Sequence, residues 1–119
     1  MRDDRERLTD ILEAITRIEK YADGGREAFE RSELVQTWIV YHVQIIGEAA
    51  GNVSPVLRSR HPEIAWPQIV AMRNLLVHEY FGIDTEEVWA TVEYDIPVVK
   101  RHVEAILREA EGPPSGVMR

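Results

Sequence analysis

Residues 32–51 read SELVQTWIVYHVQIIGEAAG, and this stretch decides the fold class. One face of a helix would collect the mostly apolar residues that recur every three or four positions, namely Val35, Trp38, Ile39, His42, Val43, Ile46 and Ala49-Ala50. That spacing predicts a helix from about Ser32 to Gly51. Because Val40, Tyr41 and Ile45 lie outside the main stripe and widen the apolar arc, we expect this helix to be central in the fold or to lie at an interface.

The same period continues on both sides of this segment. Before it, an amphipathic helix capped by Asp3 or Asp4 is expected to end at Gly24-Gly25. After it, Ser54 predicts the start of a short helix over 55–60. A third main helix is predicted to open at Pro67 and to end at Phe81-Gly82.

The last main helix is predicted to begin at Asp84-Thr85-Glu86-Glu87, a capping-box arrangement, and to continue to about Leu107. Pro97 lies inside it and predicts a kink. With no alternating strand pattern, the sequence predicts an all-α, up-and-down bundle of four main helices plus a short one. Residues 1–111 are expected to form one domain, and the tail GPPSGVMR (112–119) is expected to be disordered.

Composition limits the classes of function. The 119 residues carry a net charge of −7, which argues against a protein that coats nucleic acid or membranes through bulk electrostatics. The absence of cysteine excludes disulfides, thiol nucleophiles and Cys-ligated metals, and is typical of a cytoplasmic protein. No signal peptide or membrane span is apparent, so we expect a soluble protein. No phosphate loop or other motif for a cofactor occurs, and none is expected.

The histidines are the most informative polar residues. His42 lies on the apolar stripe of 32–51 and is expected in a core or interface, whereas His61 and His102 are expected to be exposed. His78 differs, because it belongs to RNLLVHEY (residues 73–80), where polar groups interrupt an apolar helix. Asn74 and His78 share one helix face, but Arg73 and His78 lie about 140° apart. From spacing alone, two interpretations stay open: Arg73 paired with an acid and His78 capping the helix, or both flanking one pocket.

The stretch RNLLVHEY resembles the R-x-x-x-x-H-x-Y signature of the HEPN superfamily, in the branch typified by HepT toxins. Its context is similar as well. Ile46-Gly47-Glu48-Ala49 resembles the family's I-G-E-A, and Pro62-Glu63-Ile64-Ala65-Trp66 with Met72-Arg73-Asn74 resembles its approach to the signature. Ile83-Asp84 and Val88-Trp89 resemble the stretch beyond it, and the likeness covers roughly residues 4–108.

The resemblance implies a HEPN-type bundle and a metal-independent endoribonuclease, the toxin of a type VII-like toxin–antitoxin module. It implies a homodimer whose two motifs line a shared cleft. The implied partner is a minimal nucleotidyltransferase antitoxin of the MntA type, which would neutralise the toxin by transferring AMP to Tyr80.

The motif residues suit that chemistry. Metal-free RNA cleavage needs a base for the 2′-hydroxyl, an acid for the leaving 5′-oxygen and positive charge on the phosphate. Arg73 suits the phosphate, and His78 is the motif side chain that titrates near neutral pH. Asn74 is expected to orient the imidazole or hold a phosphate oxygen, and Tyr80 to hydrogen-bond the substrate. Two histidines from a dimer could divide the roles of acid and base. Between Asn52 and Tyr80 three arginines oppose two glutamates, so this region is less acidic than the chain.

Two alternatives from other classes stay open. One is a non-catalytic HEPN module that complexes with a nucleotidyltransferase and is its modification target. The other is a plain helical dimerisation module in which Arg73 and His78 are structural. Dimerisation itself is suggested by Trp38, Trp66 and Trp89 and by the apolar surface of 32–51, which exceed what a four-helix domain needs. We place the second buried face on the helices 32–51 and 67–81, near the motif.

Overall fold

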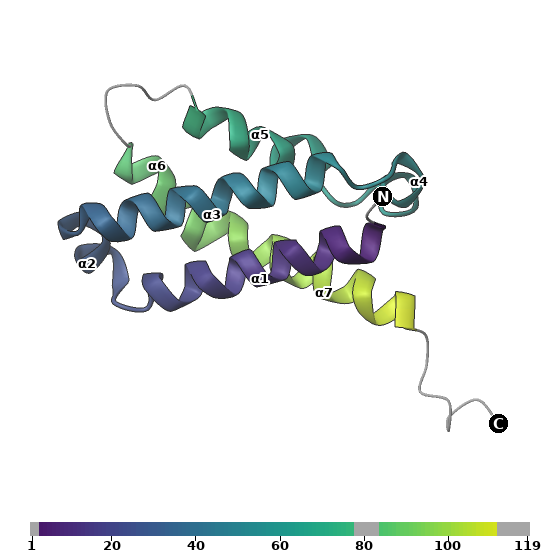
Figure 1. The fold of residues 1–119 in the computed structure, drawn as a ribbon, viewed down its shortest axis with the longest axis horizontal. Coiled ribbons are helices and arrows are strands. Elements are labelled where there is room, and N and C mark those ends of the chain that lie inside the picture. The colour runs from purple at the N-terminus through teal and green to yellow at the C-terminus, as the bar shows by residue number, and fades with distance from the viewer. Residues whose placement is uncertain (1–2, 78–83, 112–119) are drawn as a thin grey trace.

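The computed structural model describes residues 3–77 and 84–111, and within these ranges it contains helices and no strand (Figure 1). The all-α prediction is therefore confirmed. The helices are α1 (Asp4–Ala22), α2 (Gly25–Arg31), α3 (Glu33–Gly51), α4 (Pro55–Arg60), α5 (Trp66–Val77), α6 (Thr85–Ala90), the π-helix η1 (Thr91–Asp95) and α7 (Ile96–Glu111).

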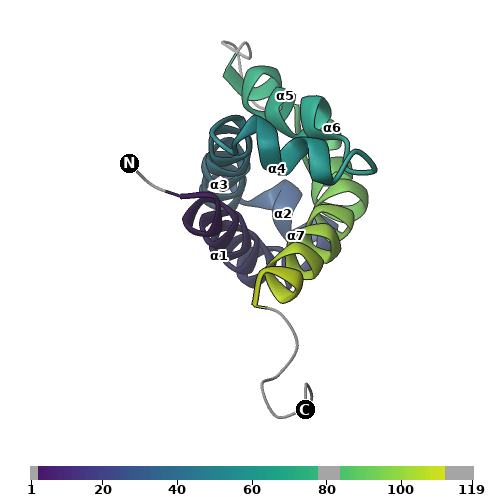
Figure 2. The same ribbon diagram turned by 90° about the vertical axis from the view of Figure 1, so that its right-hand side faces the viewer.

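Three of the four predicted main helices are α1, α3 and α5, and the fourth corresponds to the continuous run of α6, η1 and α7. The predicted short helix is α4. Seen end-on in Figure 2, α1, α3, α5 and α7 surround a common centre. α3 lies between α1 and α5 and packs against both, which is the central position that its wide apolar arc predicts. The hairpin turn through α2 closes one end of the bundle, and α4 lies at the other end (Figure 1).

The core is formed by the apolar residues that recur every three or four positions along the helices. Fully buried side chains come from α1, α2, α3 and α7, and include Leu8, Ile11, Ile15, Ile18, Phe29, Ile39, Val43, Ile46 and Val103. Burial of one such side chain contributes roughly 1.5–3 kcal/mol to the free energy of unfolding. Packing of the apolar helix faces against each other is therefore the main source of stability.

Four of the five predicted helix starts have a side-chain cap. Asp3, Ser32, Ser54 and Asp84 accept hydrogen bonds from the backbone N–H groups of Glu6, Val35, Leu57 and Glu87, respectively. Of the two candidate caps of α1, the structure selects Asp3. Asp4 has a different role: its carboxylate accepts from the backbone N–H of Ser54 at 2.8 Å and from the Ser54 hydroxyl at 2.6 Å. The first turn of α1 is thereby attached to the start of α4.

Two features differ from the prediction or refine it. The helix α2 was not predicted, because its seven residues contain a single buried side chain, Phe29, whose ring centroid lies 5.2 Å from that of Trp89. The predicted kink at Pro97 takes the form of η1, in which the backbone N–H of Ile96 bonds the carbonyl of Thr91. Pro97 lacks an N–H and its ring crowds the preceding turn, so a wider turn accommodates it.

Two of the predicted features fall on segments that the structure does not describe. The predicted end of the third helix at Phe81-Gly82 lies outside the described residues, as does the tail 112–119. Among the helices of 3–77 and 84–111, none is both long and apolar enough to cross a membrane.

Candidate functional site

The signature begins at the C-terminal half of α5. Arg73 and Asn74 lie in that helix, whereas His78 and Tyr80 lie outside the described residues, as does the side chain of Asn74. The structure therefore places one of the four candidate side chains, that of Arg73. The separation of Arg73 from His78 on the helix stays a prediction.

The backbone of Arg73 is held against α3 by a close helix crossing at Gly47. A Cβ atom placed on Gly47 would lie 2.8 Å from the backbone nitrogen of Arg73, 2.9 Å from its Cβ and 3.2 Å from the carbonyl oxygen of Val70. Real Cβ atoms do not approach other atoms so closely, so residue 47 has to be glycine for α5 to pack here. The Ile46-Gly47-Glu48-Ala49 segment thus fixes where Arg73 sits.

The Arg73 side chain lies along the C-terminal end of α3. A Cβ atom placed on Gly51 would be 4.0 Å from Arg73 Nη1 and 3.8 Å from Val70 Cγ1. Arg73 is partly buried, and no ion pair among the described residues includes it. Within this part of the chain, the acid partner that one interpretation of the sequence required is not found.

A second arginine approaches the same end of α3. Arg58 Nη2, from the last turn of α4, donates to the carbonyl of Ala50 at 2.8 Å. Arg58 Nε is buried and has no hydrogen-bond partner among the described residues. Sequence reasoning did not single out Arg58, although its place in a locally basic stretch was visible.

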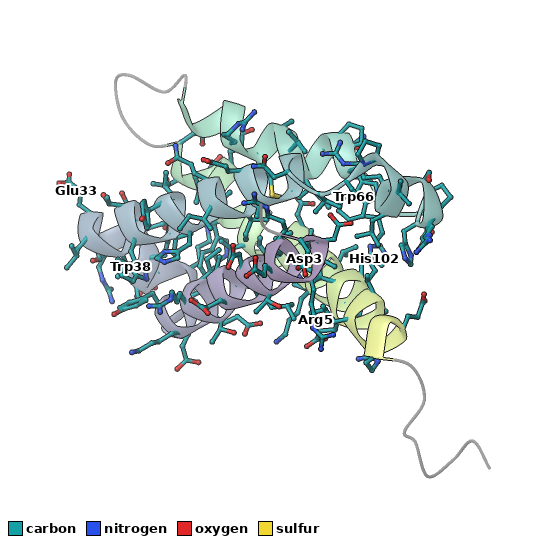
Figure 3. The ribbon with its side chains drawn as sticks, turned by 45° about the vertical axis from the view of Figure 1, so that its right-hand side comes forward. Asp3, Arg5, Glu33, Trp38, Trp66 and His102 are labelled. Atoms are coloured by element: carbon teal, nitrogen blue, oxygen red, sulfur yellow. The ribbon has the colours of Figure 1, made fainter. Side chains whose placement is uncertain are left out.

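A hollow lies on the other flank of α5, between α5, η1 and α7. It has a volume of about 490 Å³ and an apolar lining that includes Ile69, Met72, Val98 and Val99. Glu63, Gln68, Asp95 and His102 stand around it. His102 is partly buried here rather than fully solvated, and Figure 3 shows it on α7 on the same side of the bundle as Trp66.

The other histidines belong to the packing. His42 is 4% exposed, its Nδ1 lies 2.8 Å from the carbonyl oxygen of Trp38, and its ring lies 4.6 Å from that of Trp38, which confirms the prediction of a buried histidine. His61 was expected to be exposed, and this was wrong: it is 9% exposed. The indole of Trp66 donates to the His61 carbonyl, and His61 Nδ1 lies 3.4 Å from a carboxylate oxygen of Glu63. Tertiary packing by Trp66 covers a residue whose local sequence suggests a turn.

The tryptophans also require a correction to the argument for a second buried face. Trp66 and Trp89 are already buried within the chain, at 5% and 8% exposure. Trp38 is only partly buried, and Figure 3 shows it at the end of the bundle opposite Trp66. Around it, Leu34 is 79% exposed and Tyr41 is 55% exposed. Leu34, Trp38 and Tyr41 thus leave apolar surface on the outer face of α3, while Val56, Tyr94 and Val98 are exposed on other elements.

Among the residues in 3–77 and 84–111, no group of three or more His, Asp or Glu side chains is arranged to hold a metal ion. What the described part of the site offers is positive charge. A guanidinium donates hydrogen bonds in a planar fork and stays protonated, so Arg73 can bind and neutralise a phosphate but cannot take or give a proton at neutral pH.

Comparison with known proteins gives a consistent result. A family model described as "Ribonuclease HepT-like" matches residues 11–106. "Putative RNase MJ1216" of Methanocaldococcus jannaschii is 33% identical over 112 residues, which cover 93% of each chain. "Probable ribonuclease HepT" of Thermococcus cleftensis is 37% identical over 106 residues, 88% of this chain and 96% of the relative. No solved structure matches the chain.

Proposed function

Because the chain belongs to the HepT-like family of the HEPN superfamily, we propose that it is an endoribonuclease that cleaves RNA without a metal ion. The main support for the proposal is the position of Arg73 in its R-x-x-x-x-H-x-Y motif, together with its lack of a neutralising carboxylate among the described residues. Its backbone is fixed by the crossing at Gly47, and its guanidinium has no acid partner among the described residues. A guanidinium that no carboxylate neutralises is available to bind a phosphate.

The proposed reaction is an attack of the 2′-oxygen of a ribose on the neighbouring phosphorus. A base takes the 2′-hydroxyl proton, the bond from phosphorus to the 5′-oxygen breaks, and an acid supplies a proton to that oxygen. The products are a 2′,3′-cyclic phosphate and a free 5′-hydroxyl. Arg73 would hold the charge that develops on the phosphate oxygens.

The roles of base and acid fall to His78, as the motif side chain that titrates near neutral pH. One imidazole cannot easily serve both roles in a single turnover. Two copies of the chain would supply two histidines to one cleft, so the chemistry favours a homodimer. Asn74 would orient the imidazole or hold a phosphate oxygen, and Tyr80 would hydrogen-bond the substrate.

The outer face of α3 supports dimer formation because Leu34, Trp38 and Tyr41 leave neighbouring apolar side chains there accessible to a second copy. Light scattering at micromolar concentration is the direct test. A dimer is expected, and a monomer would remove the proposed division of acid and base between two copies.

We further infer that the enzyme is the toxin of a toxin–antitoxin pair and that a minimal nucleotidyltransferase is its partner. Transfer of AMP to Tyr80 would place bulk and negative charge beside Arg73, where the RNA phosphate has to bind. Intact mass after co-expression with the neighbouring nucleotidyltransferase tests this. Mass should increase by one or more AMP units in the wild type and not in Tyr80→Phe.

The test of the activity is RNA cleavage by the chain purified alone, with EDTA present. Arg73→Gln and His78→Gln should each reduce the rate by at least about 100-fold, the usual effect of removing one transition-state contact. Their far-UV circular dichroism and melting temperatures should match the wild type. Arg26→Gln, which removes one positive charge from α2, is the control and should cleave normally.

The alternative is a non-catalytic partner that only complexes with the nucleotidyltransferase. It predicts modification of Tyr80 with no cleavage by the unmodified wild type. If Arg73→Gln and His78→Gln instead lower the melting temperature, the two residues are structural, as in the plain dimerisation module.

A further inference from the structure

The C-terminal end of α3 is approached by two arginines from two different helices. Arg58 of α4 bonds the carbonyl of Ala50, and Arg73 of α5 lies over Gly51, the next residue. Gly51 is exposed and carries no side chain, so no side chain at this position covers the end of α3.

Neither arginine is neutralised by a carboxylate within the described residues. Arg17, Arg26, Arg31, His61 and Lys100 are among the cations of ion pairs there, and Arg58 and Arg73 are not. The acid nearest to Arg58 in sequence is Glu63, whose carboxylate lies 3.4 Å from His61 Nδ1. Residues 52–73 contain three arginines and one glutamate, a net charge of +2 in a chain of −7.

The contact of Arg58 with Ala50 by itself has a structural explanation, since a cation stabilises the carbonyl end of a helix. That explanation uses one of five guanidinium N–H groups and does not need a second arginine at the same place. Two like charges at one helix end repel each other, and anions bound beside them would remove the repulsion. A nucleic-acid backbone fits, because it offers successive phosphodiester groups, each with two acceptor oxygens for one planar guanidinium.

We propose that Arg58 and Arg73 form a two-arginine site for the sugar–phosphate backbone of RNA. Arg73 holds the phosphate that is cleaved, and Arg58 holds a neighbouring phosphate across Gly51. This rests on the proposed function for the identity of the ligand, and it assigns Arg58 as a binding residue that fixes the path of the strand over the end of α3.

The site contacts phosphates and not the 2′-hydroxyl, so it should bind DNA as well. The test uses a fluorescein-labelled single-stranded DNA oligonucleotide, which the proposed chemistry cannot cleave, and measures its affinity by fluorescence anisotropy over a range of salt concentrations. Arg58→Gln and Arg73→Gln should each weaken binding by about three- to tenfold at low salt, and each should reduce the salt slope by about 0.7.

Arg60→Gln is the matched control. It removes the same charge from the same short helix, is exposed, and lies about 200° around the helix from Arg58. Arg31→Gln is a second control from α2. If Arg60→Gln weakens binding as much as Arg58→Gln, a diffuse basic surface binds the strand and the two-arginine site is wrong.

Arg58→Lys is the control for folding. It keeps the positive charge and a donor for the Ala50 carbonyl, so it should keep the salt slope of the wild type. If Arg58→Gln does not fold, Arg58→Lys and Arg73→Gln decide the matter. A wild type that does not bind the oligonucleotide overturns the site even if it cleaves RNA. A wild type that binds through Arg58 and Arg73 but does not cleave RNA supports the site and contradicts the proposed ribonuclease activity.

Discussion

The backbone nitrogen of Arg73 would lie 2.8 Å from a Cβ atom at position 47, so the helix that carries Arg73 crosses α3 only because residue 47 is Gly47. The two residues are 26 positions apart in the chain. Their contact makes the position of a candidate active-site residue depend on the absence of a side chain elsewhere.

The first prediction concerns Gly47→Ala. The added methyl group meets backbone atoms of α5, which cannot move without shifting the whole helix, so the free energy of unfolding should fall by about 1–3 kcal/mol. RNA cleavage should fall too, because Arg73 is displaced. Gly51→Ala is the control: its methyl group would be in ordinary contact at 3.8–4.0 Å, and its stability in urea unfolding should equal or exceed that of the wild type. Equal losses in both variants would contradict the tight crossing.

The link between Asp4 and Ser54 provides a second prediction. Asp4→Ala removes two short hydrogen bonds, one to the Ser54 backbone and one to its hydroxyl, and should lower the free energy of unfolding by about 1–3 kcal/mol. A double-mutant cycle with Ser54→Ala should show coupling, because the two side chains bond each other. Strict additivity in that cycle would mean that the link adds no stability.

A third prediction tests the helix that the sequence did not reveal. Phe29 is 1% exposed and packs against Trp89, so Phe29→Ala should cost about 3–5 kcal/mol and release α2 from α6. Tyr94→Ala, at a position in η1 that is 67% exposed in the chain, should change stability by less than about 0.5 kcal/mol. Thermal unfolding of the two variants separates these outcomes.

The ion pair between Lys100 and Glu19 predicts an alkaline dependence. The Lys100 ammonium donates to Glu19 at 2.9 Å, and this hydrogen bond and the negative charge of Glu19 raise the pKa of Lys100 above 10.5. The pair therefore stabilises the fold below pH 10.5, and this stabilisation is lost as the pH rises through the raised pKa of Lys100. Since the pair is largely exposed, the effect should stay below about 1 kcal/mol. The stability of Lys100→Gln should fall short of the wild type at neutral pH and match it at strongly alkaline pH.

Much of the fold is predictable because its determinants are local. Asp3, Ser32, Ser54 and Asp84 mark helix starts through side chains that act within three residues. The helix α2 is not predictable in this way, because it begins at Gly25 with φ of 86° and has one core residue. Its stability comes from Trp89, which is distant in sequence.

The site shows the same division. Arg73 is found from the motif, and the resemblance draws attention to Gly47, but nothing local indicates that the two meet. The burial of His61 depends on Trp66, and the approach of Arg58 to Ala50 depends on the fold of α4 against α3. These contacts arise from packing between helices, and periodicity does not report them.

The π-helix η1 has a consequence for variation in chain length. A π turn contains more residues than an α turn, so residues 91–95 hold an extra position within an otherwise continuous helical path. The wider turn offsets the extra residue, so Val88 and Trp89 before it and Ile96 and Val99 after it all face the core. Deletion of one residue from 91–95 would restore α geometry and leave these faces nearly in register, whereas deletion of one residue within α7 would rotate everything beyond it by about 100°. We therefore expect homologous chains to tolerate loss of a residue from 91–95 better than loss of one from α7.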